Sequence, residues 1–272
     1  MSVVSFFRRH GPPRVFAHRG GCALGPENTI AAFDRGLAAG ADGLELDVVF
    51  SADGHVVVSH DRTLDRTTDA AGPVGARTVD ALARVDAGYR FTDGEGRYPC
   101  RGAGIGVPTL REVLSRYRDV PIIVEMKLDL PELGRAVAGE VARAAAADRV
   151  CAAGFGARAT RAAREALPAI ATSASRWDTR LALYRSWVGW PVRRPPYGGY
   201  LVPETAGAIR VVSRRFIRHA HEAGLDVQVW TVDAPEDIER LLAWGIDALI
   251  SDRPDVATGV RDRIASSAAT RS

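Results

Sequence analysis

The sequence contains few cysteines and almost no lysine. Its 272 residues include three cysteines, Cys22, Cys100 and Cys151, which lie far apart and form no CxxC pair. An odd number at this spacing argues against a disulfide framework and against a cysteine-based zinc site. Unpaired cysteines are typical of a reducing compartment, so we expect a cytoplasmic protein.

Long apolar runs and a strong charge imbalance are also missing. No stretch approaches the roughly 18 apolar residues that a membrane span requires, and residues 1–10 lack the order of charged and apolar residues found in secretory signals. The formal net charge is only +3, and the basic residues are spread along the chain. This pattern gives no support for a nucleic-acid partner and is compatible with a small anionic substrate. The sequence leaves the oligomeric state open.

Lysine is used at a single position. Of the 36 basic residues, one is Lys127 and the other 35 are arginine. The chain therefore uses arginine wherever any positive charge is sufficient, and a compact ammonium is indicated at position 127. The alternative is that one lysine has been retained by chance.

Short β-branched runs alternate with amphipathic helical stretches along the chain. The predicted strands span residues 15–18, 43–49, 121–127, 149–154, 169–173, 199–203, 226–231 and 246–250. The predicted helices span residues 29–39, 109–118, 131–147, 157–167, 178–186, 213–223 and 235–244. Alternating strands and helices indicate a parallel sheet, and eight strands in one chain of this length predict a closed (β/α)8 TIM barrel. A doubly wound open sheet is the alternative.

Capping residues support three helix boundaries. Thr109 and Glu112 have the spacing of a capping box. Ser213 is a predicted N-cap for the helix at 213–223, and Asp233 is a predicted N-cap for the helix at 235–244.

Two segments depart from a plain barrel. An Asp-Gly pair at 53–54 lies between β-forming runs and predicts a hairpin. Residues 62–107 are rich in glycine and loops, and we interpret them as an insertion after strand two that lies over the barrel mouth. The predicted organisation is an N-terminal tail at 1–13, a barrel at 14–256 that contains this insertion, and a disordered tail at 257–272.

Acidic residues share one face of two predicted strands. Glu45 and Asp47 are two apart on the second strand, and Glu125 and Lys127 are two apart on the third. Side chains two apart point the same way, so all four are predicted to face the barrel axis. Buried carboxylates repel one another unless a cation lies between them, and a hard divalent ion with oxygen ligands meets that need. The alternative is an internal salt bridge between Lys127 and one of the acids.

Two histidines follow predicted strands at the carboxyl edge of the barrel. His18 follows strand one, and His60 follows the hairpin and precedes Asp61. Barrel enzymes carry their chemistry at this edge. Imidazoles are suited to general acid and general base catalysis near neutral pH.

Eight short motifs occur in an order that resembles one enzyme family. They are Ala17-His-Arg-Gly20, Pro26-Glu-Asn-Thr29, Glu45-Leu-Asp47, His60-Asp61 with Leu64-Asp-Arg-Thr-Thr68, Pro108-Thr-Leu110, Glu125-Met-Lys127, Trp230-Thr-Val232 and Ser251-Asp-Arg-Pro254. Over roughly residues 14–256 the chain resembles the glycerophosphodiester phosphodiesterase family. The resemblance implies a (β/α)8 barrel with an insertion after strand two. It also implies metal-dependent hydrolysis of glycerophosphodiesters to glycerol 3-phosphate and an alcohol.

The resemblance further implies a role for each matching residue. The implied roles are catalytic histidines at His18 and His60, positive charges near the phosphate at Arg19 and Lys127, metal carboxylates at Glu45, Asp47 and Glu125, a polar residue near the metal or Arg19 at Glu27, and an aromatic pocket residue at Trp230. One divalent cation, Mg²⁺ or Ca²⁺, is implied as the cofactor. The chain departs from the family pattern at Asp233 and at Gly154-Phe155, on the rim of the implied pocket.

Two other functions fit the same residues. The first is a lysophospholipase D or related phospholipase, for which Phe6, Phe7, Arg8 and Arg9 would make weak contact with a membrane surface and the insertion would seat an acyl chain. The second is a catalytically inactive barrel that binds a phosphodiester. The sequence leaves open the headgroup alcohol, the identity of the ion, which histidine is the acid, and whether water or a substrate hydroxyl is the nucleophile.

Overall fold

The computed structural model describes residues 6–7 and 11–269, and within them eight parallel strands form a nearly closed barrel. The strands are β1 (Arg14–Ala17), β2 (Gly43–Phe50), β4 (Ile122–Met126), β5 (Val150–Ala153), β6 (Ala171–Thr172), β7 (Gly199–Pro203), β10 (Asp226–Trp230) and β11 (Ala248–Ser251). A parallel bridge between Ser173 and Gly199 joins β6 to β7 and completes the ring. The predicted barrel is therefore confirmed, and the open sheet is wrong.

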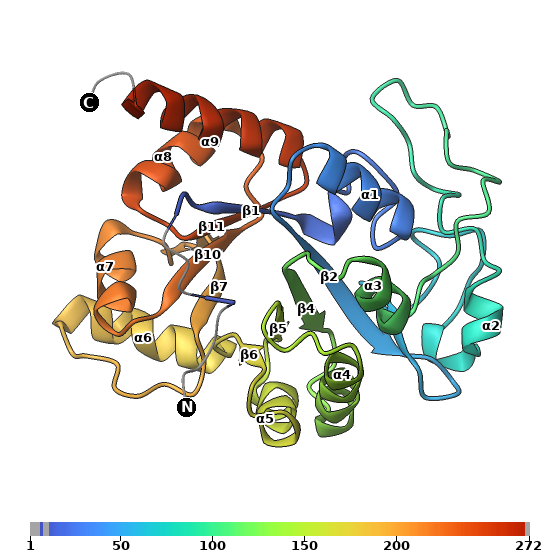
Figure 1. The fold of residues 1–272 in the computed structure, drawn as a ribbon, viewed down its shortest axis with the longest axis horizontal. Helices are drawn as coiled ribbons and strands as arrows, with labels where there is room; N and C mark the ends of the chain where they lie inside the picture. Colours follow the sequence, from blue (N-terminus) through green and yellow to red (C-terminus); the bar gives the residue numbers. More distant parts are fainter. Residues whose placement is uncertain (1–5, 8–10, 270–272) are drawn as a thin grey trace.

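Each barrel strand is followed by a helix that covers the outside of the ring (Figure 1). The helices are α1 (Ile30–Ala38), α3 (Leu110–Arg116), α4 (Pro131–Arg143), α5 (Ala157–Ala166), α6 (Arg176–Val188), α7 (Arg214–Glu222), α8 (Pro235–Trp244) and α9 (Pro254–Ala269). The first seven correspond to the seven predicted helices. The eighth, α9, was not predicted.

The strands separate two layers of apolar side chains. Leu44, Leu46 and Val48 of β2 are buried against the surrounding helices. Phe16 and Ile123, on β1 and β4, belong to a second buried cluster inside the ring. Because side chains alternate along a strand, the positions between the outward-facing residues of β2 point into the ring.

The amino-terminal end of the barrel is closed by aromatic side chains. Phe6 and Phe7 are 1% and 2% exposed, and the ring of Phe6 lies 5.9 Å from that of Phe16. A Cβ atom added at Gly199 would lie 2.8 Å from the Phe7 ring, so this contact requires glycine. The predicted N-terminal tail and its membrane contact are therefore wrong at Phe6 and Phe7, because burial inside the ring removes both rings from solvent. Residues 1–5 and 8–10, including Arg8 and Arg9, lie outside the described residues.

Helix α9 occupies most of the segment that was predicted to be a disordered tail. Ala257 and Val260 are buried in the cluster between the strands and the helices, and the Thr258 hydroxyl donates a hydrogen bond to the Ala39 carbonyl. The prediction for 257–272 is thus wrong over 257–269, because the last strand also needs a helix to cover its outer face. Residues 270–272 lie outside the described range.

Two of the three predicted helix caps are confirmed. Thr109 and Glu112 form the capping box of α3, and the Ser213 hydroxyl accepts from a backbone amide at the start of α7. Asp233 is not the N-cap of α8, which has Ala234 at that position. Its carboxylate instead accepts hydrogen bonds from the Ser251 hydroxyl and the Asp252 amide, at the end of β11.

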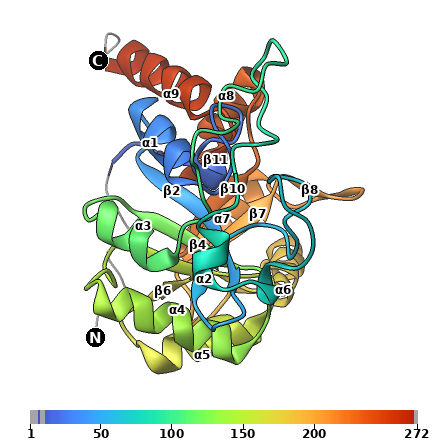
Figure 2. The same ribbon diagram turned by 90° about the vertical axis from the view of Figure 1, so that its right-hand side faces the viewer.

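The segment 62–107 lies beside α1 and α3 and has a small core of its own (Figures 1 and 2). The hairpin that precedes it is confirmed, since β3 (Val56–Val58) pairs antiparallel with β2. The segment contains the short helices η2 (Val74–Ala76) and α2 (Val79–Leu82). Its side chains pack on one another and on the hairpin through Val49, Val57, Leu64, Val74, Leu82, Val85, Ala87 and Val107.

A second hairpin lies after β7 and was not predicted. It consists of β8 (Thr205–Ala206) and β9 (Ile209–Arg210), two very short strands with exposed side chains. Figure 2 shows it projecting from the carboxyl edge of the barrel. Searching the described residues for a helix long and apolar enough to cross a bilayer finds none.

Candidate active site

Three carboxylates meet where β2 and β4 end. Each of Glu45, Asp47 and Glu125 offers an oxygen, and these oxygens lie within 4.8 Å of one another. The strand pairing explains the meeting, because Asp47 is directly opposite Glu125 in the parallel register. The Lys127 Nζ lies 2.8 Å from Glu125 Oε1 and 3.2 Å from Asp47 Oδ1. The four side chains therefore lie together, as the strand pattern predicted.

Lys127 offsets only part of this negative charge. The Glu45 side chain is buried and accepts a 3.0 Å hydrogen bond from the Arg19 backbone amide. Burial and the neighbouring Asp47 charge raise the pKa of Glu45 to about 8. The ion pair proposed as the alternative to a metal is present. Lys127 does not stabilise the ionised form of Glu45 sufficiently, however, so the three carboxylates remain suited to a hard divalent cation.

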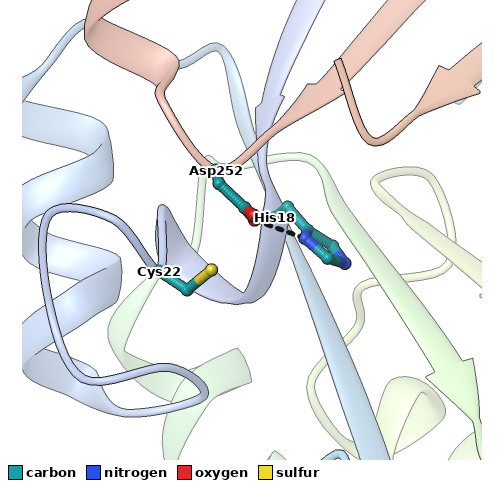
Figure 3. A group of neighbouring side chains, drawn as sticks. All are labelled: His18, Cys22 and Asp252. Carbon is teal, nitrogen blue, oxygen red and sulfur yellow. Dashed lines mark hydrogen bonds and ion pairs between the residues drawn. The ribbon is translucent and has the colours of Figure 1, made fainter. Parts of the chain in front are cut away.

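His18 is held at the edge of this cluster by an aspartate from the last strand. Its Nδ1 lies 2.5 Å from Asp252 Oδ1 (Figure 3). Its Nε2 lies 3.9 Å from Glu45 Oε2. The carboxylate of Asp252 can only accept, so the Nδ1 carries the proton and Nε2 faces the site. Burial lowers the pKa of His18, but the hydrogen bond to Asp252 and the charges of Glu45 and Asp252 outweigh it, so the pKa lies above its ordinary value.

Cys22 lies next to the His18–Asp252 pair, and no sequence pattern predicted this proximity (Figure 3). Burial and the carboxylate of Asp252 raise the pKa of the Cys22 thiol far above its ordinary value. A thiol that stays protonated is a poor metal ligand and a poor nucleophile. The carboxylate cluster is therefore the better cation site.

His60 is held in the same manner by its neighbour in sequence. Its Nδ1 lies 2.7 Å from Asp61 Oδ1. Arg66 donates to Asp61 and, through two nitrogens, to Glu27. Glu27 also accepts from the Arg19 guanidinium at 3.1 Å. Burial raises the pKa of Glu27, but Arg66 and Arg19 outweigh it, so the pKa of Glu27 lies below its ordinary value.

Three polar residues of the site were not singled out from the sequence. Asn28 donates from Nδ2 to Asp47 Oδ2 at 2.9 Å and accepts from the Asp47 amide at 3.1 Å. Asp252 orients His18, and Arg66 joins the His60 side to Glu27. All three lie within motifs that the sequence did show, but only the folded chain reveals their partners.

A cavity of about 420 Å³ opens beside the carboxylates. Trp230, Glu125 and Phe155 all lie on its wall. The rings of Phe155 and Trp230 meet edge to face at 5.9 Å, and the Lys127 Nζ is also 5.9 Å from the Phe155 ring centre. The polar cluster and the cavity therefore form one continuous site.

Comparison with known proteins gives a consistent result. The model of the "Glycerophosphoryl diester phosphodiesterase family" matches residues 18–256. A glycerophosphodiester phosphodiesterase from Caldanaerobacter subterraneus subsp. tengcongensis is 31% identical over 251 residues, which cover 89% of this chain and 94% of the relative.

Solved structures show the same similarity. The glycerophosphoryl diester phosphodiesterase domain of an uncharacterized protein from Mycobacterium tuberculosis superposes with a TM-score of 0.80 at 26% identity, covering 93% of this chain and all of that one. A glycerophosphodiester phosphodiesterase from Agrobacterium tumefaciens superposes with a TM-score of 0.71 at 26% identity, covering 90% of this chain and 99% of that one.

Proposed function

This chain belongs to the glycerophosphoryl diester phosphodiesterase family and is a glycerophosphodiester phosphodiesterase, and we propose that it works with one bound divalent cation and releases glycerol 3-phosphate and an alcohol. The observation that carries the proposal is the meeting of Glu45, Asp47 and Glu125 beside Lys127. Such a site offers anionic ligands for a metal ion and cationic groups for a phosphate within a few ångströms of one another.

The cation would be held by Glu45, Asp47 and Glu125. Oxygen ligands of this kind fit Mg²⁺ or Ca²⁺. Burial and the neighbouring Asp47 charge raise the pKa of Glu45, and a positive ion beside it would favour the ionised form that binds metal. When bound, the ion would neutralise phosphate oxygens and stabilise the charge that develops on them. Asn28 would keep the Asp47 carboxylate aimed at the site, because it bonds that residue at both its side chain and its amide.

Arg19 and Lys127 would bind the other phosphate oxygens. Glu27 holds the Arg19 guanidinium, and two carboxylates hold the Lys127 ammonium. Both cations are thus fixed before a substrate arrives, and fixed positive charge is most effective at stabilising a transition state. Trp230 would contact the organic part of the substrate, since it lies where the polar cluster meets the cavity.

His18 and His60 would exchange the two protons of the reaction. Asp252 and Asp61 each hold an Nδ1 proton, which leaves an Nε2 on each imidazole for proton transfer. One histidine would remove a proton from the nucleophile, either water or a glycerol hydroxyl, as the new bond to phosphorus forms. The other would protonate the oxygen of the departing alcohol as its bond to phosphorus breaks.

An inactive phosphodiester-binding barrel is less well supported by the same residues. Loss of catalysis usually accompanies loss of a catalytic side chain, whereas both histidines, all three carboxylates and both cations are present here. The three cysteines are free thiols, which supports a reducing compartment such as the cytoplasm as the place of action.

A product assay with metal-stripped enzyme tests the proposal. Glycerophosphocholine, glycerophosphoethanolamine and glycerophosphoinositol are supplied in turn, with Mg²⁺ or Ca²⁺ added back. We expect glycerol 3-phosphate and the free alcohol to appear only when a cation is present. Full activity in excess chelator would overturn the metal, and release of a phosphorylated alcohol would overturn the assigned products.

A further inference from the structure

A second group of metal-ligand atoms lies on the far side of His18 from the carboxylate cluster. Each of His18, Cys22 and Asp252 offers one ligand atom, and these atoms lie within 4.8 Å of one another. Figure 3 shows the Cys22 sulfur pointing toward the His18–Asp252 pair. The His18 nitrogen on this side is Nδ1, which contacts Asp252, whereas Nε2 lies on the side of Glu45. The two groups of ligands therefore use opposite edges of one imidazole ring.

The backbone holds these three residues together. His18 and Asp252 directly follow β1 and β11, two strands that pair side by side in the barrel. Cys22 lies in the turn after the short helix η1 (His18–Gly20). The next residue in that turn, Ala23, donates a backbone hydrogen bond of 3.3 Å to the Asp252 carbonyl. The positions of the three side chains are therefore set by strand pairing and by a fixed turn.

One nitrogen, one sulfur and one oxygen are the donors that zinc binds in proteins. Bond lengths of about 2.0–2.3 Å place neighbouring ligand atoms of a tetrahedral zinc ion roughly 3.3–3.8 Å apart. The donors here span a similar range, from 2.5 Å between His18 and Asp252 to at most 4.8 Å. Small rotations of the side chains would therefore admit the ion. Three protein ligands leave its fourth position to water.

The thiol makes this site different in kind from the carboxylate cluster. Cys22 is half-buried, whereas Cys100 and Cys151 are buried, so Cys22 is the cysteine that an ion from solvent can reach. Burial and Asp252 keep its thiol protonated in the metal-free protein, and hard ions such as Mg²⁺ and Ca²⁺ prefer oxygen ligands. A thiophilic ion displaces the thiol proton as it binds, and its charge offsets that of Asp252. The site therefore selects a thiophilic ion, and the carboxylates select a hard one.

We propose that His18, Cys22 and Asp252 form a second metal site, which binds zinc, and that zinc bound there inhibits the enzyme. The inhibition rests on the proposed function, in which His18 transfers a proton, whereas the binding does not depend on it. Zinc takes the place of the proton between His18 Nδ1 and the Asp252 carboxylate. The thiol proton is released to solvent, and the proton of the neutral imidazole moves from Nδ1 to Nε2.

This change removes His18 from either of its possible roles. With zinc on Nδ1 and a proton on Nε2, the ring has no free lone pair, so it can no longer act as a base. The Nε2–H of such a ring is also a much weaker acid than an imidazolium, so it cannot act as the acid near neutral pH. Asp252 binds the ion and no longer orients the ring. Inhibition is therefore expected whichever proton His18 transfers.

Cobalt(II) binding to the full-length protein tests the site without an activity assay. Cobalt accepts the same ligands as zinc, and a thiolate bound to it gives a charge-transfer absorption that carboxylate ligands do not give. We expect this absorption in the wild type and its loss when zinc is added. It should be absent in Cys22→Ala and unchanged in Cys151→Ala, the matched control, whose thiol is buried inside the ring. Its absence from the wild type, or its persistence in Cys22→Ala, would overturn the site.

Zinc inhibition of glycerophosphocholine hydrolysis tests the consequence. The assay contains saturating Mg²⁺ or Ca²⁺, and a metal buffer sets the free zinc concentration. The inhibition constant should rise about 10–100-fold in Cys22→Ala, because losing a direct ligand costs at least as much as losing a group that orients one. Cys151→Ala should be as sensitive to zinc as the wild type. Without zinc, Cys22→Ala should keep wild-type activity, because the thiol takes no part in the proposed reaction.

The two measurements separate this proposal from the proposed function. Equal zinc sensitivity in the wild type and Cys22→Ala, relieved by more Mg²⁺ or Ca²⁺, would show that zinc acts at the carboxylates and would overturn the inhibitory site. If the wild-type enzyme hydrolyses no glycerophosphodiester at all, the proposed function has failed. The cobalt absorption then still decides whether His18, Cys22 and Asp252 bind a metal ion.

Discussion

The wall of the site formed by β1, β2 and β4 is crowded with charges, whereas the wall formed by β5, β7, β10 and α6 is mainly apolar and borders a cavity, with Arg176 and Arg180 as its charged members. On the polar wall the charged groups already have partners: Lys127 contacts two carboxylates, and Arg19 contacts Glu27. On the apolar wall the side chains of Phe155 and Ile209 border an open volume. The first wall thus holds charged groups at fixed positions, and the second borders a cavity that can bind an apolar part of a ligand.

This difference indicates how the two walls divide the work. Charged groups act over short distances and lose effect when displaced, so changes on the polar wall should alter the rate of the chemical step. Apolar surface contributes in proportion to the area that it covers, so changes on the other wall should alter which substrates bind. A substitution on the polar wall that altered only substrate binding, or one on the apolar wall that slowed the chemical step on every substrate, would contradict this division.

The largest effect is expected from the metal carboxylates. Asp47→Asn removes a charge that would bind both the cation and Lys127, and it should lower kcat on the order of 10³-fold on every substrate. Titration calorimetry should show weaker Mg²⁺ or Ca²⁺ binding by the same variant. Glu236→Gln on α8 is the control for an exposed carboxylate outside the site. Normal ion affinity in Asp47→Asn would remove Asp47 from the metal site.

Loss of either histidine should have the next largest effect. His18→Ala and His60→Ala should each lower kcat about 10²-fold or more, because each removes a proton-transfer group. A substrate with a nitrophenol leaving group separates their roles, since an acidic phenol departs without protonation. The variant that recovers activity on this substrate has lost the acid, and the other has lost the base. A variant with near-full activity on glycerophosphocholine would show that its histidine takes no part.

The lone lysine tests how closely the polar wall is fitted. Lys127→Arg keeps the positive charge but replaces a compact ammonium by a longer planar fork between Glu125 and Asp47. We expect kcat/KM to fall about 10-fold to 100-fold, or about 1.4–2.7 kcal/mol. Steady-state kinetics decides the matter, with thermal denaturation to confirm folding. Wild-type kcat/KM would mean that any cation serves at position 127.

The polar wall could be predicted from the sequence because its residues are close neighbours along the chain. Glu45 and Asp47 are two apart on one strand, and so are Glu125 and Lys127, so strand geometry alone places each pair on one face. The barrel could also be predicted, because short apolar runs typical of strands alternate regularly along the chain with stretches of helical periodicity. The partnership of His18 with Asp252 was beyond such reasoning, because the two residues are 234 positions apart.

The apolar wall could not be predicted for the same physical reason. Its cavity is lined by residues from position 125 to position 230, on several strands, α6 and a hairpin. A cavity that forms only when distant segments pack together leaves no local pattern in the sequence. Phe6, Phe7 and α9 were misjudged because their burial depends on distant partners, namely the ring interior and the outer face of the last strand.

The smallest expected effect concerns stability. The loss in the free energy of unfolding should depend on pH for a substitution on the polar wall and should be independent of pH for one on the apolar wall. Burial raises the pKa of Glu27 and the ion pairs with Arg66 and Arg19 more than offset it, so its pKa in the folded protein lies below its ordinary value. A lowered carboxyl pKa contributes stability above the ordinary pKa of about 4.3, and this contribution disappears as the pH falls through the folded value.

Glu27→Gln should therefore lower the free energy of unfolding by about 1 kcal/mol at pH 7 and by much less near pH 3, since Arg66 is half exposed and solvent weakens its pairing. Urea denaturation in chelator at both pH values measures the difference without interference from a metal ion. Glu132→Gln, whose partner Arg135 is on the same exposed face of α4, is the control and should change little. Phe155→Leu on the apolar wall should show a loss that is the same at both pH values, because no titrating group is removed. A loss for Glu27→Gln that is equally independent of pH would mean that packing, and not charge, holds the polar wall at this point.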